Sequence, residues 1–416
     1  MDPANAKFVC GAECGIAVVG TLSAGTEHWS AVSGTTTVVT SGPSPMRSTR
    51  CFRMQPNNSV IQLDHTFASA IASPATFVGR CYVYFASLPA SDMPLFTANP
   101  SGTSGSLTYQ SSSGAIKTQG ASGSFGASGV AVTTGQWYCL DLKAVLNTTL
   151  TVDGAVNGVA LAQRSEAASA ASCTSVRIQG NTAGTADVYF DDVLVSGTSG
   201  DYPIGDGTVV GLYPNADATS DAATPTQRQM DHCWTPNTDF GKGAGGATSM
   251  GNQNAEATSW QSLANPLSTS TATNWIACIL NASSEWVAWK FDDLPGSAAS
   301  VNGVMIVWAS HSASATSNNL QIQIGSGDGA GGFVWVTGVP TMSFDLSETT
   351  ITVPVGIVAS ANGSAFTPTL VNGMKAKVTS SDVNPDAYLD GLCFEVDYVP
   401  LGSVPKASPY PQMIGR

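Results

Sequence analysis

Short segments in which apolar and polar residues alternate recur along most of the chain, and turn residues separate nearly all of them. Alternation with a period of two is typical of a β-strand with one buried face. Residues 187–195 are the clearest example, and the Asp153-Gly154 pair between two such segments favours a type I′ hairpin turn. Helical periodicity is almost absent, with residues 160–171 as the main helix candidate. The sequence therefore predicts an all-β protein.

The strand-like segments fall into two series, separated by a passage that is rich in Gly, Asn, Ala and Thr. A chain of 416 residues also exceeds what one hydrophobic core usually serves. Trp234 and Trp260 of the passage need burial, so it is expected to pack on a domain or on a neighbouring subunit. We predict an N-terminal arm (1–24), a first β-sandwich (25–200), an extended connector (201–270), a second antiparallel β-sandwich (271–400) and a C-terminal tail (401–416).

The charge balance excludes several classes of partner. Charged residues make up 11% of the chain, against roughly 25% in ordinary soluble domains. The net charge is −13, and binding to nucleic acid or to an anionic membrane needs clustered cations instead. Neutral Gly, Ser, Thr and Asn replace the charges, a composition typical of extracellular β-proteins, fibres and viral surface proteins. We therefore expect no nucleic-acid partner and no membrane insertion.

The sequence also lacks export and membrane signals. No run of 18 or more apolar residues is present, so no membrane-spanning helix is predicted. The chain begins Met1-Asp2-Pro3, and its first apolar patch is interrupted by Glu13, whereas a secretory signal has a basic start and an unbroken apolar core. The protein is expected to be made in the cytoplasm without a signal peptide.

The nine cysteines are an odd number, and most lie inside strand-like segments. A disulfide framework favours an even count and loop positions, so buried thiols are the expectation. Cys10 and Cys14 have the spacing of half a metal site, but no second Cys/His pair at ligand spacing follows them. The four histidines, His28 among them, are dispersed along the chain. No metal site is predicted from these residues.

No catalytic pattern accompanies the strands. Retaining glycosidases place two carboxyl groups roughly 5–5.5 Å apart, and Glu395-x-Asp397 is the nearest approach to such a pair. This pair lies in a strand that needs one face for packing, and no third acid follows it. A Gly-x-Ser-x-Gly nucleophile motif is also absent. The chain is therefore predicted not to be an enzyme; a glycosidase that depends on Glu395 is the alternative.

The first 200 residues resemble the concanavalin A-like (laminin-G-like) jelly roll. The resemblance rests on an early segment at Trp29, on the central strands 77–85 and 136–142, and on the closing strand 188–193. In that family a Trp-Tyr-x-Leu-x-Leu strand precedes an Asp-Gly turn, and the last strand ends near Asp-Asp-Val. Residues 137–142, Asp153-Gly154 and Asp191-Asp192 occur here in that order.

The whole chain also resembles modular proteins of tailed bacteriophages, in which such a jelly roll precedes a Tyr-Pro-x-Gly-Asp-Gly segment and a second β-rich domain. Residues 202–207 carry that segment, and residues 381–385 resemble the ending of the second domain. The resemblance covers most of residues 25–400 through short motifs. It implies a structural protein of the tail or head surface.

Two kinds of ligand deserve separate consideration for a jelly roll. Some members bind Ca²⁺ at a rim through carboxylates; the candidates here are Asp64, Asp191, Asp192 and Asp206. Their spacing fits no defined loop, so no cofactor is predicted. Asp191 and Asp192 are adjacent, so on a strand they point to opposite faces and are expected at a solvated strand end.

Sugar binding is the second kind. Lectin-type sites stack an aromatic ring on the sugar. The candidate glycan contacts are Tyr109, Trp234 and Trp260, with Trp137 expected in the core instead.

These observations predict a structural component of a tailed-phage virion, a minor tail or fibre-type protein. Its expected location is the particle, and its expected partners are copies of itself and other virion proteins, with the host surface as a further contact. A capsid decoration or head-fibre protein is the alternative of the same class. A carbohydrate-binding adhesin for the host surface is the alternative of another class. A nearly neutral surface suits lasting contacts, because salt weakens charged contacts most.

Overall fold

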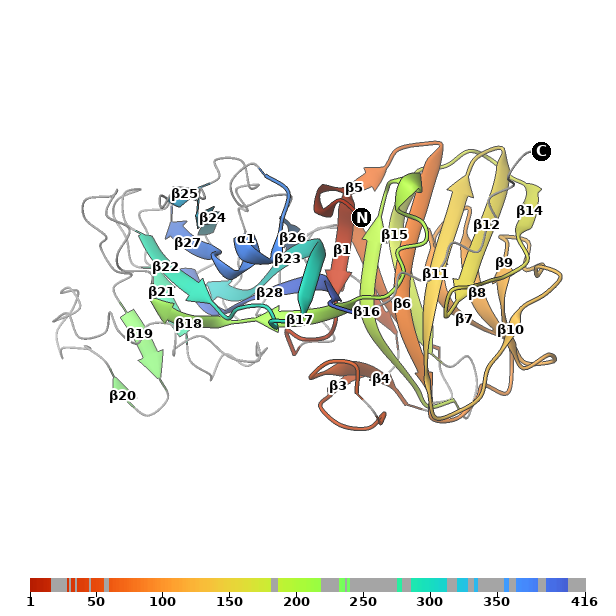
Figure 1. Ribbon diagram of the computed structural model, residues 1–416, viewed down its shortest axis with the longest axis horizontal. Coiled ribbons are helices and arrows are strands. Elements are labelled where there is room, and N and C mark those ends of the chain that lie inside the picture. Colours follow the sequence, from red (N-terminus) through yellow and green to blue (C-terminus); the bar gives the residue numbers. More distant parts are fainter. Residues whose placement is uncertain are drawn as a thin grey trace.

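The described residues of the computed structural model are 1–15, 28–29, 31–33, 36–44, 46–55, 60–180, 186–217, 232–235, 238–239, 275–278, 286–312, 320–327, 333–335, 355–358, 364–380 and 387–402. They form four sheets arranged in two units (Figure 1). The prediction of an all-β protein is confirmed. The described helices are short: η1 (Pro3–Asn5), η2 (Ser199–Asp201) and α1 (Pro368–Asn372). None of them has the length and apolar character needed to cross a membrane.

The first unit consists of two antiparallel sheets. One runs β13-β12-β11-β6-β16-β4-β3, with β1 beside β16 and β14 beside β12. Its strands are β1 (Ala6–Cys10), β3 (Thr36–Val39), β4 (Cys51–Met54), β6 (Ala75–Phe85), β11 (Trp137–Leu146), β12 (Thr149–Val156), β13 (Val159–Ala160), β14 (Arg164–Ala167) and β16 (Val188–Ser196). The other runs β10-β9-β8-β7-β15-β5-β2. Its strands are β2 (Ala31–Ser33), β5 (Ile61–Ile71), β7 (Met93–Ala98), β8 (Gly105–Gln110), β9 (Ala115–Gln119), β10 (Val130–Ala131) and β15 (Cys173–Gly180).

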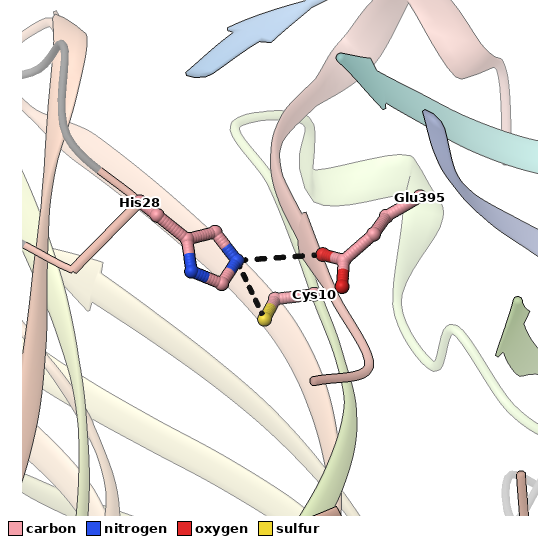
Figure 2. A group of neighbouring side chains, drawn as sticks. All are labelled: Cys10, His28 and Glu395. Carbon is pink, nitrogen blue, oxygen red and sulfur yellow. Dashed lines mark hydrogen bonds and ion pairs between the residues drawn. The ribbon is translucent and has the colours of Figure 1, made fainter. Parts of the chain in front are cut away.

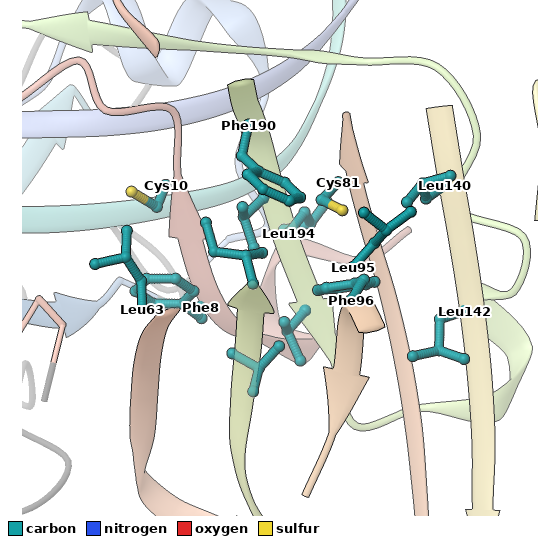
Figure 3. Packing of buried hydrophobic residues seen from close by; sticks show 14 of the residues in the cluster. Phe8, Cys10, Leu63, Cys81, Leu95, Phe96, Leu140, Leu142, Phe190 and Leu194 are labelled. Carbon is teal, nitrogen blue, oxygen red and sulfur yellow. The ribbon is translucent and has the colours of Figure 1, made fainter. Parts of the chain in front are cut away.

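Apolar side chains from the two sheets of the first unit meet in one core (Figure 3). Phe77 on β6 packs edge-on against Phe96 on β7, with ring centroids 5.9 Å apart. Phe85 at the end of β6 lies 5.9 Å from Tyr109 on β8. The alternation read from the sequence places these residues on inward faces, because successive side chains of a strand point to opposite sides. Residues 160–171 are not helical: β14 occupies part of this range and pairs with β12.

The second unit also has two sheets. One runs β20-β19-β21-β28-β23-β26, with β17 beside β28, and the other runs β18-β22-β27-β24-β25. Their strands are β17 (Thr208–Leu212), β18 (Pro214–Asp217), β19 (His232–Thr235), β20 (Thr238–Asp239), β21 (Trp275–Cys278), β22 (Trp286–Phe291), β23 (Ala298–Ser312), β24 (Leu320–Gly327), β25 (Phe333–Trp335), β26 (Val355–Ile357), β27 (Lys375–Ser380) and β28 (Ala387–Pro400). Phe291 on β22 and Phe394 on β28 join the sheets, with ring centroids 4.5 Å apart.

Residues 208–217 differ from the predicted extended connector. They form β17 and β18, which pair with β28 and β22 of the second unit. These strands were missed because Gly211, Pro214 and Asn215 interrupt the apolar pattern. The second unit therefore begins close behind the first, and the range 201–270 is not one extended connector.

Strand β1 lies between the two units (Figure 1). It pairs with β16 of the first unit, and its other neighbours include β23 and β28 of the second. Gly303 on β23 allows this approach, because a Cβ there would lie 2.8 Å from Cγ2 of Val9. Residues 6–10 of the predicted N-terminal arm are therefore a strand at the joint between the units.

Candidate functional site at the joint between the two units

Strand β28 has both faces buried. Successive side chains along it point alternately into the second unit and toward the first unit. Leu392, Phe394 and Val396 belong to the core of the second unit. Glu395 and Asp397, two positions apart, point the other way and bond to residues of the first unit. The two acids nearest to a glycosidase pattern are thus fully buried at the joint.

Arg80 and Asp397 form an ion pair across the joint. Both side chains have no exposed surface, and Arg80 Nη2 donates to Asp397 Oδ2. Arg80 Nη2 also donates to the backbone carbonyl of Asp192 at 3.1 Å, and Asn302 donates to Asp397 Oδ1 at 2.8 Å. Burial opposes the charge on the guanidinium, but the neighbouring carboxylate of Asp397 raises the pKa of Arg80 above its ordinary value. The pair holds β6 against β28.

Asp192 occupies a bulge in β16. Its φ is +51°, and the register of β16 against β6 shifts between Asp191 and Leu194. In this conformation the carboxylate of Asp192 accepts hydrogen bonds from Arg47 Nε and from the backbone N–H of Val209, each at 2.7 Å. Asp and Asn adopt positive φ more readily than most residues do. The bulge therefore aims one carboxylate at the first residues of the second unit.

Asp191 is also fully buried, so the expected solvated strand end is wrong for both acids. Its Oδ2 accepts from Ser48 Oγ at 2.8 Å, and its Oδ1 accepts from the backbone N–H of Asp192 at 2.8 Å. Burial raises the pKa of Asp191 well above its ordinary value, and the charge of Asp192 raises it further. The two adjacent acids share one buried environment because the bulge breaks the alternation.

The raised pKa of Asp191 predicts a pH dependence of stability. The folded chain binds this proton more tightly than the unfolded chain, so the contribution of Asp191 to the free energy of unfolding falls as the pH rises from about 4 through the raised pKa. One such proton gives a slope of up to about 1.4 kcal/mol per pH unit. Asp191→Asn keeps an oxygen that accepts from the N–H of Asp192, and its NH2 group can donate to Ser48 Oγ in place of accepting from it. The variant is expected to remove this slope and to be at least as stable as the wild type at pH 7. Urea unfolding at a series of pH values measures both, and an unchanged slope contradicts the prediction.

The four calcium candidates do not form one cluster. Asp64 on β5 binds Arg177 through both oxygens, at 2.6 and 2.7 Å. Asp206 accepts from the hydroxyl of Tyr82 and lies 3.7 Å from Arg47 Nη2. Asp191 and Asp192 have the partners described above, so each candidate carboxylate has a protein donor. The prediction that no cofactor is bound stays a prediction.

The aromatic candidates lie in different places. Tyr109 on β8 is 3% exposed, so its ring has no free face for a sugar, and its assignment as a glycan contact is corrected on this ground. Trp137 is half-buried beside Tyr84, with ring centroids 5.5 Å apart. Trp234 lies in β19, and Trp260 lies outside the described residues.

Cys10, Cys14, His28 and Glu395 lie together at the joint, and each is fully buried. Figure 2 shows the thiol of Cys10 and the carboxylate of Glu395 beside one edge of the His28 ring. The distances to His28 Nε2 are 3.1 Å from Cys10 Sγ, 3.4 Å from Glu395 Oε2 and 3.8 Å from Cys14 Sγ. The backbone N–H of Cys14 donates to Glu395 Oε1 at 3.1 Å. Burial raises the pKa of the Cys10 thiol well above its ordinary value, and Glu395 raises it further.

Little in the sequence predicts this cluster. Cys10-x-x-x-Cys14 is the one local signal. Glu395, which lies beside His28 in the structure, follows it by 367 positions in the sequence. Although the histidines are dispersed along the chain, the fold brings His28 next to Cys10 and Glu395. The seven cysteines whose side chains the structure describes are buried thiols, as expected.

Comparisons with known proteins assign no family. No protein-family model matches the chain, and no curated protein matches it. Parts of solved structures are similar to it. A protein described as cellulose induced protein Cip1 is 15% identical over 39% of this chain and 86% of its own, with a TM-score of 0.32. An endo-β-1,4-glucuronan lyase from the fungus Trichoderma reesei is 12% identical over 46% and 96%, with a TM-score of 0.32.

The globular domain of a T. cruzi calreticulin is also similar, at 10% identity over 47% of this chain and 89% of that domain, with a TM-score of 0.35. Similarity at these levels of identity and TM-score assigns no substrate and no reaction to the chain.

Proposed function

We propose that the chain is a structural component of a tailed-phage virion, of the minor tail or fibre type. It assembles through the surfaces of its two sandwich units with copies of itself and with other virion proteins. The observation that carries this proposal is the joint: the acids that most resemble catalytic residues, Glu395 and Asp397, are buried there and bond to residues of the first unit. Their contacts join the two units.

The segment at 202–207 that resembles phage proteins supports the same function. The backbone N–H of Gly205 donates to Asp141 Oδ1 at 3.1 Å, and the carbonyl of Gly207 accepts from Arg47 Nη2 at 2.7 Å. Asp206 accepts from the hydroxyl of Tyr82. The segment is thus fixed on the first unit immediately before β17 enters the second. A fixed passage between two units favours a rigid building block over two freely moving domains.

Particle association tests the proposal. Lysates of cells that produce the phage are separated on a density gradient, and the protein is followed with an antibody. We expect it to sediment with the particles at a constant ratio to the major capsid protein, and to stay with them at high salt. Detection only in the unsedimented fraction would contradict the proposal. Antibody labelling in the electron microscope then separates the tail position from the capsid decoration or head-fibre alternative.

The adhesin alternative has its own test. A glycan array is probed with the purified protein, and the proposed structural role predicts no selective binding. Selective micromolar binding that Trp234→Ala abolishes would favour an adhesin. Tyr109→Ala is unsuitable as a probe, because the buried ring belongs to the core. Hydrolysis of a cell-wall or capsular polysaccharide that Glu395→Gln abolishes would favour a glycosidase.

A further inference from the structure

We propose that Cys10, Cys14, His28 and Glu395 bind a structural zinc ion that joins the two units. Cys10 is the last residue of β1, and Cys14 follows in the turn after it. His28 precedes Trp29, whose ring packs in the core of the first unit. Glu395 comes from β28 of the second unit. An ion held by these four side chains would tie three distant parts of the chain to one point.

The separations between the side chains are close to those of ligands around one ion. With Zn–S near 2.3 Å and Zn–N and Zn–O near 2.1 Å, a tetrahedron places S and N about 3.6 Å apart and N and O about 3.4 Å apart. The corresponding distances from His28 Nε2 are 3.1 Å to Cys10 Sγ, 3.8 Å to Cys14 Sγ and 3.4 Å to Glu395 Oε2. The ligand atoms of Cys10, His28 and Glu395 all lie within 4.8 Å of one another. Cys14 Sγ stands beside this group, 3.8 Å from Nε2 and 3.9 Å from Nδ1 of His28, and becomes the fourth ligand when its side chain rotates toward Nε2.

The contacts of Cys10 and Glu395 converge on one nitrogen of His28, which distinguishes an ion site from a catalytic triad. In a triad the nucleophile and the acid bond to opposite nitrogens of the histidine. Here the thiol of Cys10 and the carboxylate of Glu395 both approach Nε2. All four side chains also lack exposed surface, so no substrate reaches them. A thiol and a carboxylate that both lie next to the same imidazole nitrogen have the arrangement of ligands around a shared metal ion.

The chemistry of the ligand set favours zinc. Thiols and imidazoles are the donors that structural zinc sites combine, and a carboxylate oxygen is a further zinc ligand, whereas oxygen-preferring ions such as Ca²⁺ and Mg²⁺ do not select thiols. A dication also offsets the charge of a buried carboxylate and of thiols that ionise on binding.

The surroundings hold the ligands in place. The backbone N–H of Cys14 donates to Glu395 Oε1 at 3.1 Å, and the carbonyl of His28 bonds to His65 Nδ1 at 3.0 Å. The ring of His65 in turn stacks on Phe8 with centroids 3.9 Å apart. Such outer contacts orient metal ligands.

Metal content is the first test. The full chain is produced in zinc-supplemented medium, desalted, and measured by inductively coupled plasma mass spectrometry. We expect about one zinc per chain in the wild type, as for a single structural site, and at least a tenfold loss in Cys10→Ser and in His28→Gln. Cys173→Ser is the control: it changes another fully buried thiol, on β15, and serine keeps a donor for the carbonyl of Ser175. Zinc retained in both ligand variants, or absent from the wild type, overturns the proposal.

A second test does not depend on whether the variants fold. Chelation of the wild-type protein is expected to lower its Tm by about 5 °C or more, and zinc to restore it, because the ion binds the folded chain preferentially. Replacement by Co²⁺ is expected to give a thiolate-to-metal charge-transfer band. A Tm unaffected by chelation, or a Co²⁺ spectrum without that band, contradicts the site. So does a Cys10–Cys14 disulfide in the mass of the non-reduced, alkylated protein.

Discussion

Replacing Arg80 by methionine is expected to lower the free energy of unfolding by about 3–5 kcal/mol. The substitution leaves the carboxylate of Asp397 buried without its cation, and it also removes the donors to the carbonyl of Asp192. Most of the expected loss comes from the uncompensated charge, because the net stabilisation by an intact buried pair is small. Urea unfolding followed by tryptophan fluorescence measures the difference.

Two further variants make the explanation specific. Arg80→Met combined with Asp397→Leu removes both charges and is expected to recover much of the lost stability. Arg53→Met breaks the pair with Asp187 at the surface of the first unit, where the side chains are 31% and 18% exposed, and is expected to cost about 1 kcal/mol or less. Equal losses in Arg53→Met and Arg80→Met would show that burial at the joint is not the cause.

Replacing Asp192 by alanine is expected to cost about 3 kcal/mol or more, since two mechanisms add. The variant loses the charge-assisted hydrogen bonds from Arg47 and Val209, each worth about 1.5–3 kcal/mol when made to a charged group. It also places a Cβ-bearing residue without a local polar partner at a φ of +51°, at a cost of about 1 kcal/mol.

Asp192→Asn separates these two causes. Asparagine tolerates positive φ and keeps an oxygen for the N–H of Val209, so it loses the charge and the acceptor that pair with Arg47 Nε. We expect a loss near half of that in the alanine variant, measured by the same unfolding experiment. If asparagine and alanine are equally destabilising, the backbone conformation contributes nothing, and the account of the bulge is wrong.

The alternation of apolar and polar residues predicted the strands well wherever one face of the strand is buried. It failed for β17, in which Gly211 interrupts the run, and for β14, whose small and charged residues at an edge read as a helix. Edge pairing decided the second case, because β14 completes its hydrogen bonds on β12. The local pattern of apolar and polar residues gives no information about which strands pair.

The joint was harder to predict than the sheets. The sequence places Glu395 and Asp397 in a strand that needs one face for packing, yet β28 is packed on both faces. Asp191 and Asp192 were assigned to opposite faces, a rule that a bulge suspends. Their side-chain partners in the first unit come from sequence positions more than a hundred away, as with Asp192 and Arg47. A single sequence contains no record of such contacts, so it predicts candidate residues but not their partners.

The largest hydrophobic cluster is not confined to the first unit. Val209, Met305, Val307 and Cys393 of the second unit belong to the same cluster as Phe8. A recombination event that exchanged either half near residue 200 would uncover this apolar surface on both fragments. The two halves are therefore expected to be inherited together. To make a soluble fragment of either half, the apolar residues exposed at the cut would have to be replaced by polar ones.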